Sequence, residues 1–367
     1  TEIYTLSLHD ALPIWVGLLP VVLLALLLIV LGGSFVKPII SGTVALSSDA
    51  VNRARAFSIF YMVVNIGSFT GKTIVAPIRI QLGVGTVPYF SAAMAALALV
   101  LVLLLYRPKS ELSTRPRSVA ETLQGMAAAL SNGRFLALIL ITAGFWAIQG
   151  QRYASMPDYV LRMVGSEAKP EWLANVNPLV VVLLVVLVTQ MVRTWRPEWS
   201  IGVAMLLIPF SALCMAFSRF LPGSMRFLGI DWHPVTVMMI AGIAIQGLAE
   251  CFLSPKYLEF ASKQAPPGRE GLYLGYAHLN TFFAWIFGFI FGGILLKVFC
   301  PEPSTLPEAV QAQRLEALAG RAEMPAEYAQ AHYLWYAFAL VGLLSFLALT
   351  VFILVTRALD ARRAPRA

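Results

Sequence analysis

Two charged residues lie inside long apolar runs, where a charge is costly. Lys37 lies within the run from Val16 to Leu46 and is followed directly by Pro38. At about 1.5 Å per residue of helix, Lys37 lies about 18 Å from Asp49, the next charge along the chain. Glu250 is the only carboxylate in the central part of its own apolar run. Such charges usually mark a substrate or ion pathway, so both residues are candidates for binding or proton exchange.

Structural roles are the alternative for both charges. Lys37 could reach the membrane interface from a strongly tilted helix, with its aliphatic stem in the apolar region. Glu250 could be neutralised by a lysine and lock two parts of the protein together. The residues alone leave these alternatives open.

Polar side chains that need partners lie in several other apolar runs. Asn65 and Asn177 carry amides that must be hydrogen-bonded inside a membrane, and Tyr61 precedes Asn65 by one helical turn on the same face. His278 and Asn280 lie close together, and histidine titrates near neutral pH. These residue types are typical of a polar binding site; the alternative is hydrogen bonding that holds helices together.

The composition is that of a protein that crosses a membrane several times. Of its 367 residues, 59% are hydrophobic and 13% are charged, and the mean hydropathy is +0.76. The formal net charge of +8 comes from basic residues clustered in short loops, which does not indicate nucleic-acid binding. Cys214, Cys251 and Cys300 are widely spaced and form no metal or disulfide pattern. The sequence therefore predicts no metal, no cofactor and no nucleic-acid partner.

Nine apolar segments of roughly 20 to 30 residues are each long enough to cross a bilayer as a helix. They span residues 15–46, 54–80, 87–106, 132–153, 172–193, 197–218, 234–262, 270–299 and 331–357. The polar stretch 107–131 between the third and fourth segments is predicted to be a linker. Residues 300–327 carry several prolines and an acidic helical pattern, which predicts an exposed loop with a short surface helix.

Loop charges predict the orientation of these segments. Lysine and arginine are more frequent in the loops on the side of the linker and of the tail, residues 358–367, than in the alternate loops. By the positive-inside rule, the linker and the C-terminal tail are predicted to be cytoplasmic, in a multi-pass protein of a bacterial inner or plasma membrane. The linker divides the chain into a partial N-terminal bundle of three helices, 15–106, and a C-terminal bundle of six helices, 132–357.

The first fourteen residues, TEIYTLSLHDALPI, need separate treatment. They resemble the translated read-through of a sequencing adapter, so residues 1–14 are predicted to be a non-native leader, with native sequence from about Trp15. A genuine short amphipathic leader is the alternative. Nine spans divided into three and six by the linker fit a six-plus-six carrier whose first three helices are missing.

Motifs in several of the apolar segments are distinctive. The runs GGSFVKPIISG (32–42) and FSIFYMVVNIGS (57–68) flank a basic loop, and GFWAIQGQ (144–151), ANVNPL (174–179) and GLAECFLSPKYLEFASKQAPPGREGLYLG (247–275) follow. The first four resemble the fourth, fifth, seventh and eighth helices of the proton-dependent oligopeptide transporter family, within the major facilitator superfamily. The last resembles the tenth helix of that family, its loop and the start of the eleventh. The resemblance implies an all-α, two-bundle membrane fold of twelve helices, of which about nine are present in this sequence.

The resemblance also implies a substrate cavity between the bundles. In the family, the position of Lys37 serves coupling and the substrate's carboxylate, and that of Glu250 helps hold its amino end. Asn65 and Asn177 correspond to positions at the peptide backbone and amino end. The predicted substrate-binding residues are Lys37, Tyr61, Asn65, Trp146, Asn177, Glu250, Tyr276 and Asn280, and the predicted proton-coupling residues are Glu250, Lys37 and His278. For the two aromatic residues matched to the family's pocket, Trp146 and Tyr276, ordinary helix packing is the alternative.

One departure from the family pattern changes the charge balance of this cavity. The family usually has a glutamate in its seventh helix where this chain has Gly150, which puts the standard proton relay and the pairing of that acid with Lys37 in doubt. Lys72 adds a further positive charge inside the membrane. Lys37, Lys72 and Arg152 thus face only Glu250, an excess that suits an anionic substrate as well as a zwitterionic peptide.

The function expected from these observations is secondary active transport by alternating access. The first hypothesis is proton-coupled symport of di- or tripeptides or related small organic solutes. The alternatives are a major-facilitator carrier of an organic anion or drug, and a non-transporting membrane protein. An enzyme is not expected, because Asp231 and His233 are the nearest approach to a catalytic pair and form no recognisable constellation. The expected partners are a small solute, protons and lipid, with the protein as a monomer.

Overall fold

The computed structural model describes residues 8–49, 52–106, 118–165, 168–221, 223–227, 229–265 and 270–363. Residues 1–7 of the predicted leader, residues 107–117 of the predicted linker and residues 364–367 of the tail lie outside this description. The backbone at Lys37 and Pro38 is helical, and their side chains also lie outside it.

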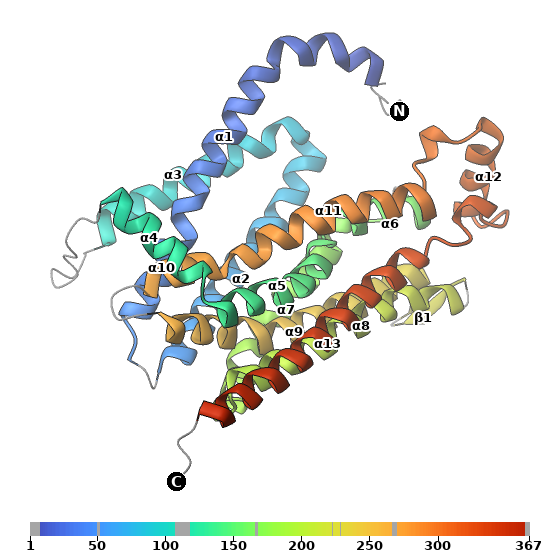
Figure 1. Cartoon of the computed structure of the whole chain (residues 1–367). Helices are drawn as coiled ribbons and strands as arrows, with labels where there is room; N and C mark the ends of the chain where they lie inside the picture. Colours follow the sequence, from blue (N-terminus) through green and yellow to red (C-terminus); the bar gives the residue numbers. More distant parts are fainter. Residues whose placement is uncertain are drawn as a thin grey trace.

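The chain is built almost entirely of α-helices (Figure 1). Its helices are α1 (Leu8–Leu46), α2 (Arg53–Leu82), α3 (Val87–Leu105), α4 (Val119–Leu130), α5 (Gly133–Gly150), α6 (Ser155–Met163), α7 (Pro170–Met191), α8 (Pro197–Ala216), α9 (Pro234–Gln264), α10 (Glu270–Ala277), α11 (Leu279–Phe299), α12 (Glu308–Leu318) and α13 (Tyr333–Arg363). The strands β1 (Met225–Phe227) and β2 (Ile230–Trp232) form an antiparallel hairpin before α9.

Nine helical stretches of the described chain are long and apolar enough to cross a membrane. They coincide with the nine predicted segments, so the prediction of an all-α polytopic protein is confirmed. Two details differ from the prediction. The fourth span runs over Gly133–Val164, past the predicted end, as two helices α5 and α6 with a break between them. The second half of the predicted linker is the helix α4, which opens with a reciprocal capping box between Ser118 and Glu121.

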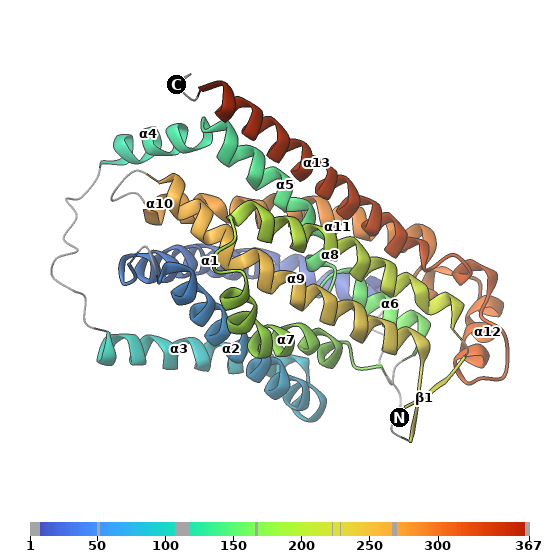
Figure 2. The ribbon, with the colours of Figure 1, turned by 90° about the horizontal axis from the view of Figure 1, so that it is seen from below.

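The helices from α5 onward form the main packed body of the molecule (Figures 1 and 2). Within it, α8 packs against α9 and α13, α7 packs against α9, and α5 packs against α11 and α13. The helix α2 crosses this body and packs on α7 and α9, while α1 contacts α10. The apolar windows of α1 and α3 have no buried residue. Such fully apolar, unburied helix faces are suited to contact with lipid.

Different elements lie at the two ends of the helical body. In both views, α12 and the β hairpin lie at one end, and α4 and the C-terminus lie at the other. The loop that contains α12 is less exposed than predicted, because Arg314 is buried. Its guanidinium donates to the carbonyls of Leu161 and Arg162 at 3.0 and 2.9 Å. A cation on the last carbonyls of α6 satisfies acceptors that the helix itself leaves unpaired.

Helix starts follow the local sequence. Proline occupies the first position of α7, α8 and α9, where its missing N–H is not needed. Asn132 caps α5 by accepting from the Phe135 N–H at 3.2 Å. His233 caps α9 in the same way, with Nδ1 accepting from the Val235 N–H at 3.2 Å. Burial lowers the pKa of His233, which favours the neutral ring that can accept this bond.

Glycines allow the closest helix contacts of the body. A Cβ on Gly242 of α9 would lie 2.7 Å from the carbonyl oxygen of Ser211 and 2.7 Å from Cγ of Met215, both on α8. A Cβ on Gly247 would lie 2.9 Å from Cβ of Val180 on α7. Real Cβ contacts are not this short, so any larger residue must separate the helices.

We predict that Gly242→Ala lowers stability by overpacking the contact between α8 and α9. The expected cost is about 1–3 kcal/mol, measured as a lower apparent melting temperature of the purified protein in detergent. Gly202→Ala is the matched control, because a Cβ on Gly202 in α8 has no atom within 4 Å. Equal melting temperatures for the two variants would contradict close packing at Gly242.

Candidate functional site

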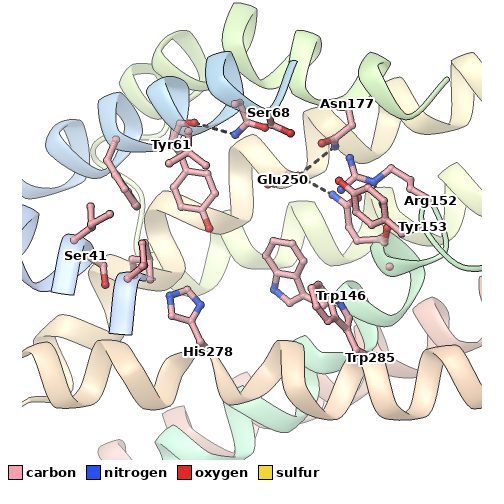
Figure 3. A pocket seen from close by; sticks show the side chains of 18 of the residues that line it. Ser41, Tyr61, Ser68, Trp146, Arg152, Tyr153, Asn177, Glu250, His278 and Trp285 are labelled. Atoms are coloured by element: carbon pink, nitrogen blue, oxygen red, sulfur yellow. Dashed lines mark hydrogen bonds between the residues drawn. The ribbon is translucent and has the colours of Figure 1, made fainter. Parts of the chain in front are cut away.

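A cavity of about 520 Å³ lies where α1 and α2 meet the main body (Figure 3). Its polar and aromatic lining comes from α1, α2, α5, the α5–α6 break, α7, α9 and the start of α11: Ser41, Phe60, Tyr61, Asn65, Ser68, Lys72, Trp146, Gln149, Arg152, Tyr153, Asn177, Glu250, His278 and Trp285. Polar groups from several separate helices thus converge on one space inside an apolar protein. Such a combination is typical of a small-molecule binding site.

Glu250 is buried at the wall of the cavity and is held by two neutral amides (Figure 3). Gln149 Nε2 and Asn177 Nδ2 both donate to its Oε2, at 2.9 and 3.2 Å. Within the described part of the chain, no ion pair involves Glu250. The amides stabilise the carboxylate without cancelling its charge, so this charge stays available to a cation or a proton.

A break in the fourth span positions one side of the site. The amide of Gln151 donates to the carbonyls of Ala147 and Gly288, at 2.8 and 3.0 Å, and its oxygen accepts from Ser155 Oγ at 2.6 Å. These bonds fix the end of α5 and the start of α6 against α11. In membrane proteins, interrupted helices of this kind are tolerated where backbone lines a cavity.

Two cations and a tyrosine meet at this break. Lys72 Nζ donates to the hydroxyl of Tyr153 at 3.1 Å and lies 5.1 Å from the ring centroid. The guanidinium carbon of Arg152 lies 5.4 Å from the same centroid. Each cation–π contact contributes about 0.5–2 kcal/mol. The tyrosine therefore holds two positive charges at one edge of the cavity.

A second cavity of about 640 Å³ adjoins the first and is lined by four of the same residues. The shared wall consists of Ser68, Lys72, Arg152 and Tyr153. At the far side of the second cavity, Arg79 of α2 pairs with Glu171 of α7 at 2.6 Å.

Thr73 and Asn175 make a further polar contact between α2 and α7. Asn175 Nδ2 donates to Thr73 Oγ1 at 3.1 Å. Together with the ion pair between Arg79 and Glu171, this contact closes one end of the seam between α2 and the main body.

Six of the predicted site residues line the central cavity: Tyr61, Asn65, Trp146, Asn177, Glu250 and His278. Tyr276 and Asn280 are not among its lining residues. Asn280 is buried and donates to Thr142 Oγ1 of α5 at 3.4 Å, and the partly buried Tyr276 packs on the hydrophobic core. The side chain of Lys37, predicted for both binding and coupling, lies outside the described residues.

Several polar and aromatic lining residues were missed by the sequence analysis: Ser41, Phe60, Ser68, Gln149, Tyr153 and Trp285. Gln149 lies in the last turn of α5, Tyr153 lies in the turn that follows it, and Trp285 covers Gly150 at the end of the helix. A Cβ on Gly150 would lie 3.3 Å from Cδ1 of Trp285 and 3.4 Å from Cε1 of Phe289. The indole thus fills the space that a glutamate at this position would need. The polar run after Gly150 was the only sign of the break in the sequence.

The fold and the site define a helical membrane protein with a polar cavity among its spans. No protein-family model matches the chain. Over 248 residues, 66% of the chain, it is 25% identical to the "Uncharacterized MFS-type transporter YttB" of Bacillus subtilis, 57% of which is covered. Over 193 residues, 52% of the chain, it is 25% identical to the "Multidrug resistance protein MdtH" of Aeromonas hydrophila, 44% of which is covered.

These similarities support membership of the major facilitator superfamily. The chain spans about half the length of the curated relatives it matches. The relatives are named as transport or resistance proteins and not as enzymes.

We predict that Gln149→Leu destabilises the protein, because it removes one of two hydrogen bonds to a buried carboxylate. A bond to a charged group contributes about 1.5–3 kcal/mol. In a double-mutant cycle with Glu250→Leu, the two losses should be less than additive, as measured by thermal unfolding. Gln190→Leu is the control, since Gln190 is exposed on α7. Fully additive losses would show that the two side chains do not interact.

Proposed function

We propose that this protein is a major-facilitator carrier that couples uptake of a small organic solute to protons. The first candidate substrates are di- and tripeptides, in line with the motif resemblance. The observation that supports coupling most directly is the placement of Glu250, a buried carboxylate held by neutral amides at a cavity wall. Intramembrane acids facing a cavity are typical of proton relays in transporters.

In this proposal, α1–α3 and the helices from α5 onward are two units that rock about the central cavity. Glu250 holds the amino end of the solute, and its protonation weakens that hold and favours one of the two conformations. Tyr61, Asn65, Trp146 and Asn177 contact the solute from the cavity wall. Proposed coupling roles for Lys37 and His278, and binding roles for Tyr276 and Asn280, rest on the resemblance.

A carrier of an organic anion or drug is the second candidate. It is favoured by the similarity to a protein named for multidrug resistance and by the aromatic side chains of Tyr61, Trp146 and Trp285 in the cavity. Competition separates the candidates: displacement of a bound solute by a dipeptide favours peptide transport, and displacement by a simple carboxylate alone favours the anion carrier.

We further propose that the protein works as a monomer in a bacterial inner or plasma membrane, with residues 358–367 in the cytoplasm. Under this orientation, α12 and the β hairpin lie on the outside, at the end of the molecule opposite the C-terminus (Figure 1). The ion pair between Arg79 and Glu171 then belongs to the outer part of the seam.

We predict that Glu250→Gln abolishes proton-driven accumulation and leaves solute exchange intact. The amide resembles the protonated acid in shape and cannot release a proton. The measurement is uptake of a radiolabelled dipeptide into liposomes that contain the protein expressed from its complete gene, with and without an imposed proton gradient. Glu308→Gln is the control, because Glu308 is exposed on α12. Unchanged accumulation by Glu250→Gln at a low external solute concentration would rule out this role.

We predict that Arg79→Glu and Glu171→Arg each slow transport, and that the double reversal restores most of the rate. A half-exposed ion pair contributes only about 0.2–1 kcal/mol, so the single variants should fold normally and be slowed severalfold. Initial rates of uptake in the same liposomes measure the effect. Equal rates for the single and double variants would show that the pair has no part in closing the seam.

A further inference from the structure

Among the described residues, the two cations at the α5–α6 break form no ion pair with an acidic side chain. Lys72 and Arg152 contact the same ring, that of Tyr153. A ring attracts a cation without neutralising it, and two like charges over one ring repel each other.

Arg152 also has fewer hydrogen-bond acceptors around it than its guanidinium has donors. Its side chain is buried, with the residue 7% exposed, and its Nε donates to the carbonyl of Gln149 at 3.2 Å. Its Nη1 is buried and has no hydrogen-bond partner among the described residues. Buried arginines normally use their planar fork on a carboxylate or phosphate. An unpaired buried donor of this kind is costly, and an acceptor that enters the cavity removes the cost.

Tyr153 and Lys72 face open space, and the buried Arg152 borders it. Tyr153 is 52% exposed and Lys72 is partly exposed. Both belong, with Arg152, to the wall that the two cavities share. Figure 3 shows Arg152 and Tyr153 on the same side of the cavity as Glu250 and Asn177. A solute in the central cavity therefore reaches the two cations and the Glu250 carboxylate together.

We infer that Lys72, Arg152 and Tyr153 form a subsite for a carboxylate of the transported solute. The Arg152 guanidinium donates to one carboxylate oxygen, and the Tyr153 hydroxyl, which accepts from Lys72, donates its own proton to the other. Lys72 supplies the second positive charge. This inference rests on the proposed carrier function and deepens it, since it assigns to this subsite the solute's acidic end, opposite the amino end at Glu250.

Calorimetric titration of the purified protein, expressed from its complete gene, tests the subsite. The probes are alanyl-alanine, its C-terminal amide and succinate. Arg152→Gln and Lys72→Gln should each weaken binding of the free acids at least tenfold and leave binding of the amide unchanged. Tyr153→Phe, which keeps the ring under both cations, should weaken the acids severalfold and serves as the variant least disturbing to the fold.

Two surface cations provide matched controls for the loss of charge. Arg357 lies 4.9 Å from the ring of Trp199, and Lys169 lies 5.8 Å from the ring of Trp172, and neither lines either cavity. Arg357→Gln and Lys169→Gln therefore remove the same charge and the same kind of ring contact. Neither control should change the affinity for any probe.

The possible outcomes separate the subsite from the proposed function. If a probe binds and the Arg152 and Lys72 variants leave the preference for acid over amide unchanged, the subsite is wrong and the carrier function stands. If succinate binds through these residues and the dipeptide does not, the subsite is supported and peptide transport fails. If no carboxylate binds the wild-type protein, the subsite is overturned, while uptake in liposomes still judges the carrier function.

Discussion

The carboxyl group of Glu250 must be hydrogen-bonded inside an apolar body, and the arrangement of the cavity depends on this constraint. Its two donors come from different helices, Gln149 at the end of α5 and Asn177 in α7. For Asn177 to reach α9, the helices must approach closely one turn before Glu250. Gly247 permits this, since a Cβ there would lie 3.1 Å from the carbonyl oxygen of Asn177. The close packing of α7 on α9 and the hydrogen bonding of Glu250 therefore depend on each other.

The donor on α5, Gln149, lies one residue before the point at which the fourth span is interrupted. The residues after Gly150 do not continue the helix. Instead the chain turns at residues 151–154, and Gln151 binds α11 through the carbonyl of Gly288. Arg152 and Tyr153 lie in this turn, and Arg152 Nε donates to the backbone carbonyl of Gln149, whose side chain binds Glu250. The anion-binding and acid groups proposed for this protein therefore have a common structural origin.

Apolar length alone was sufficient to predict the nine spans, because a helix that crosses lipid must satisfy its own backbone groups. Polar groups in such helices need partners, which marked Glu250, Asn65 and Asn177 as candidates, and the motif resemblance placed them in one site. Gln149 and Tyr153 were missed, because a helix break depends on tertiary hydrogen bonds that no local pattern records. Asn280 was grouped with the site, although its amide faces Thr142 across the α5–α11 contact. Sequence patterns give the depth of a residue better than the direction in which it points.

The way the charges are held argues for ligand binding rather than for internal cross-linking. Arg152 lies three residues after Gln149, the residue that holds Glu250, yet its Nε is bonded to the backbone of α5 and it forms no ion pair with that carboxylate. If these charges served only to hold the helices together, we would expect them to form an ion pair. Burying a pair costs much less free energy than burying two separate charges. Here neutral amides bind the Glu250 carboxylate, and the ring of Tyr153 contacts Lys72 and Arg152. These contacts stabilise the charges without neutralising them. A solute with an amino group and a carboxylate supplies the missing partner at each end.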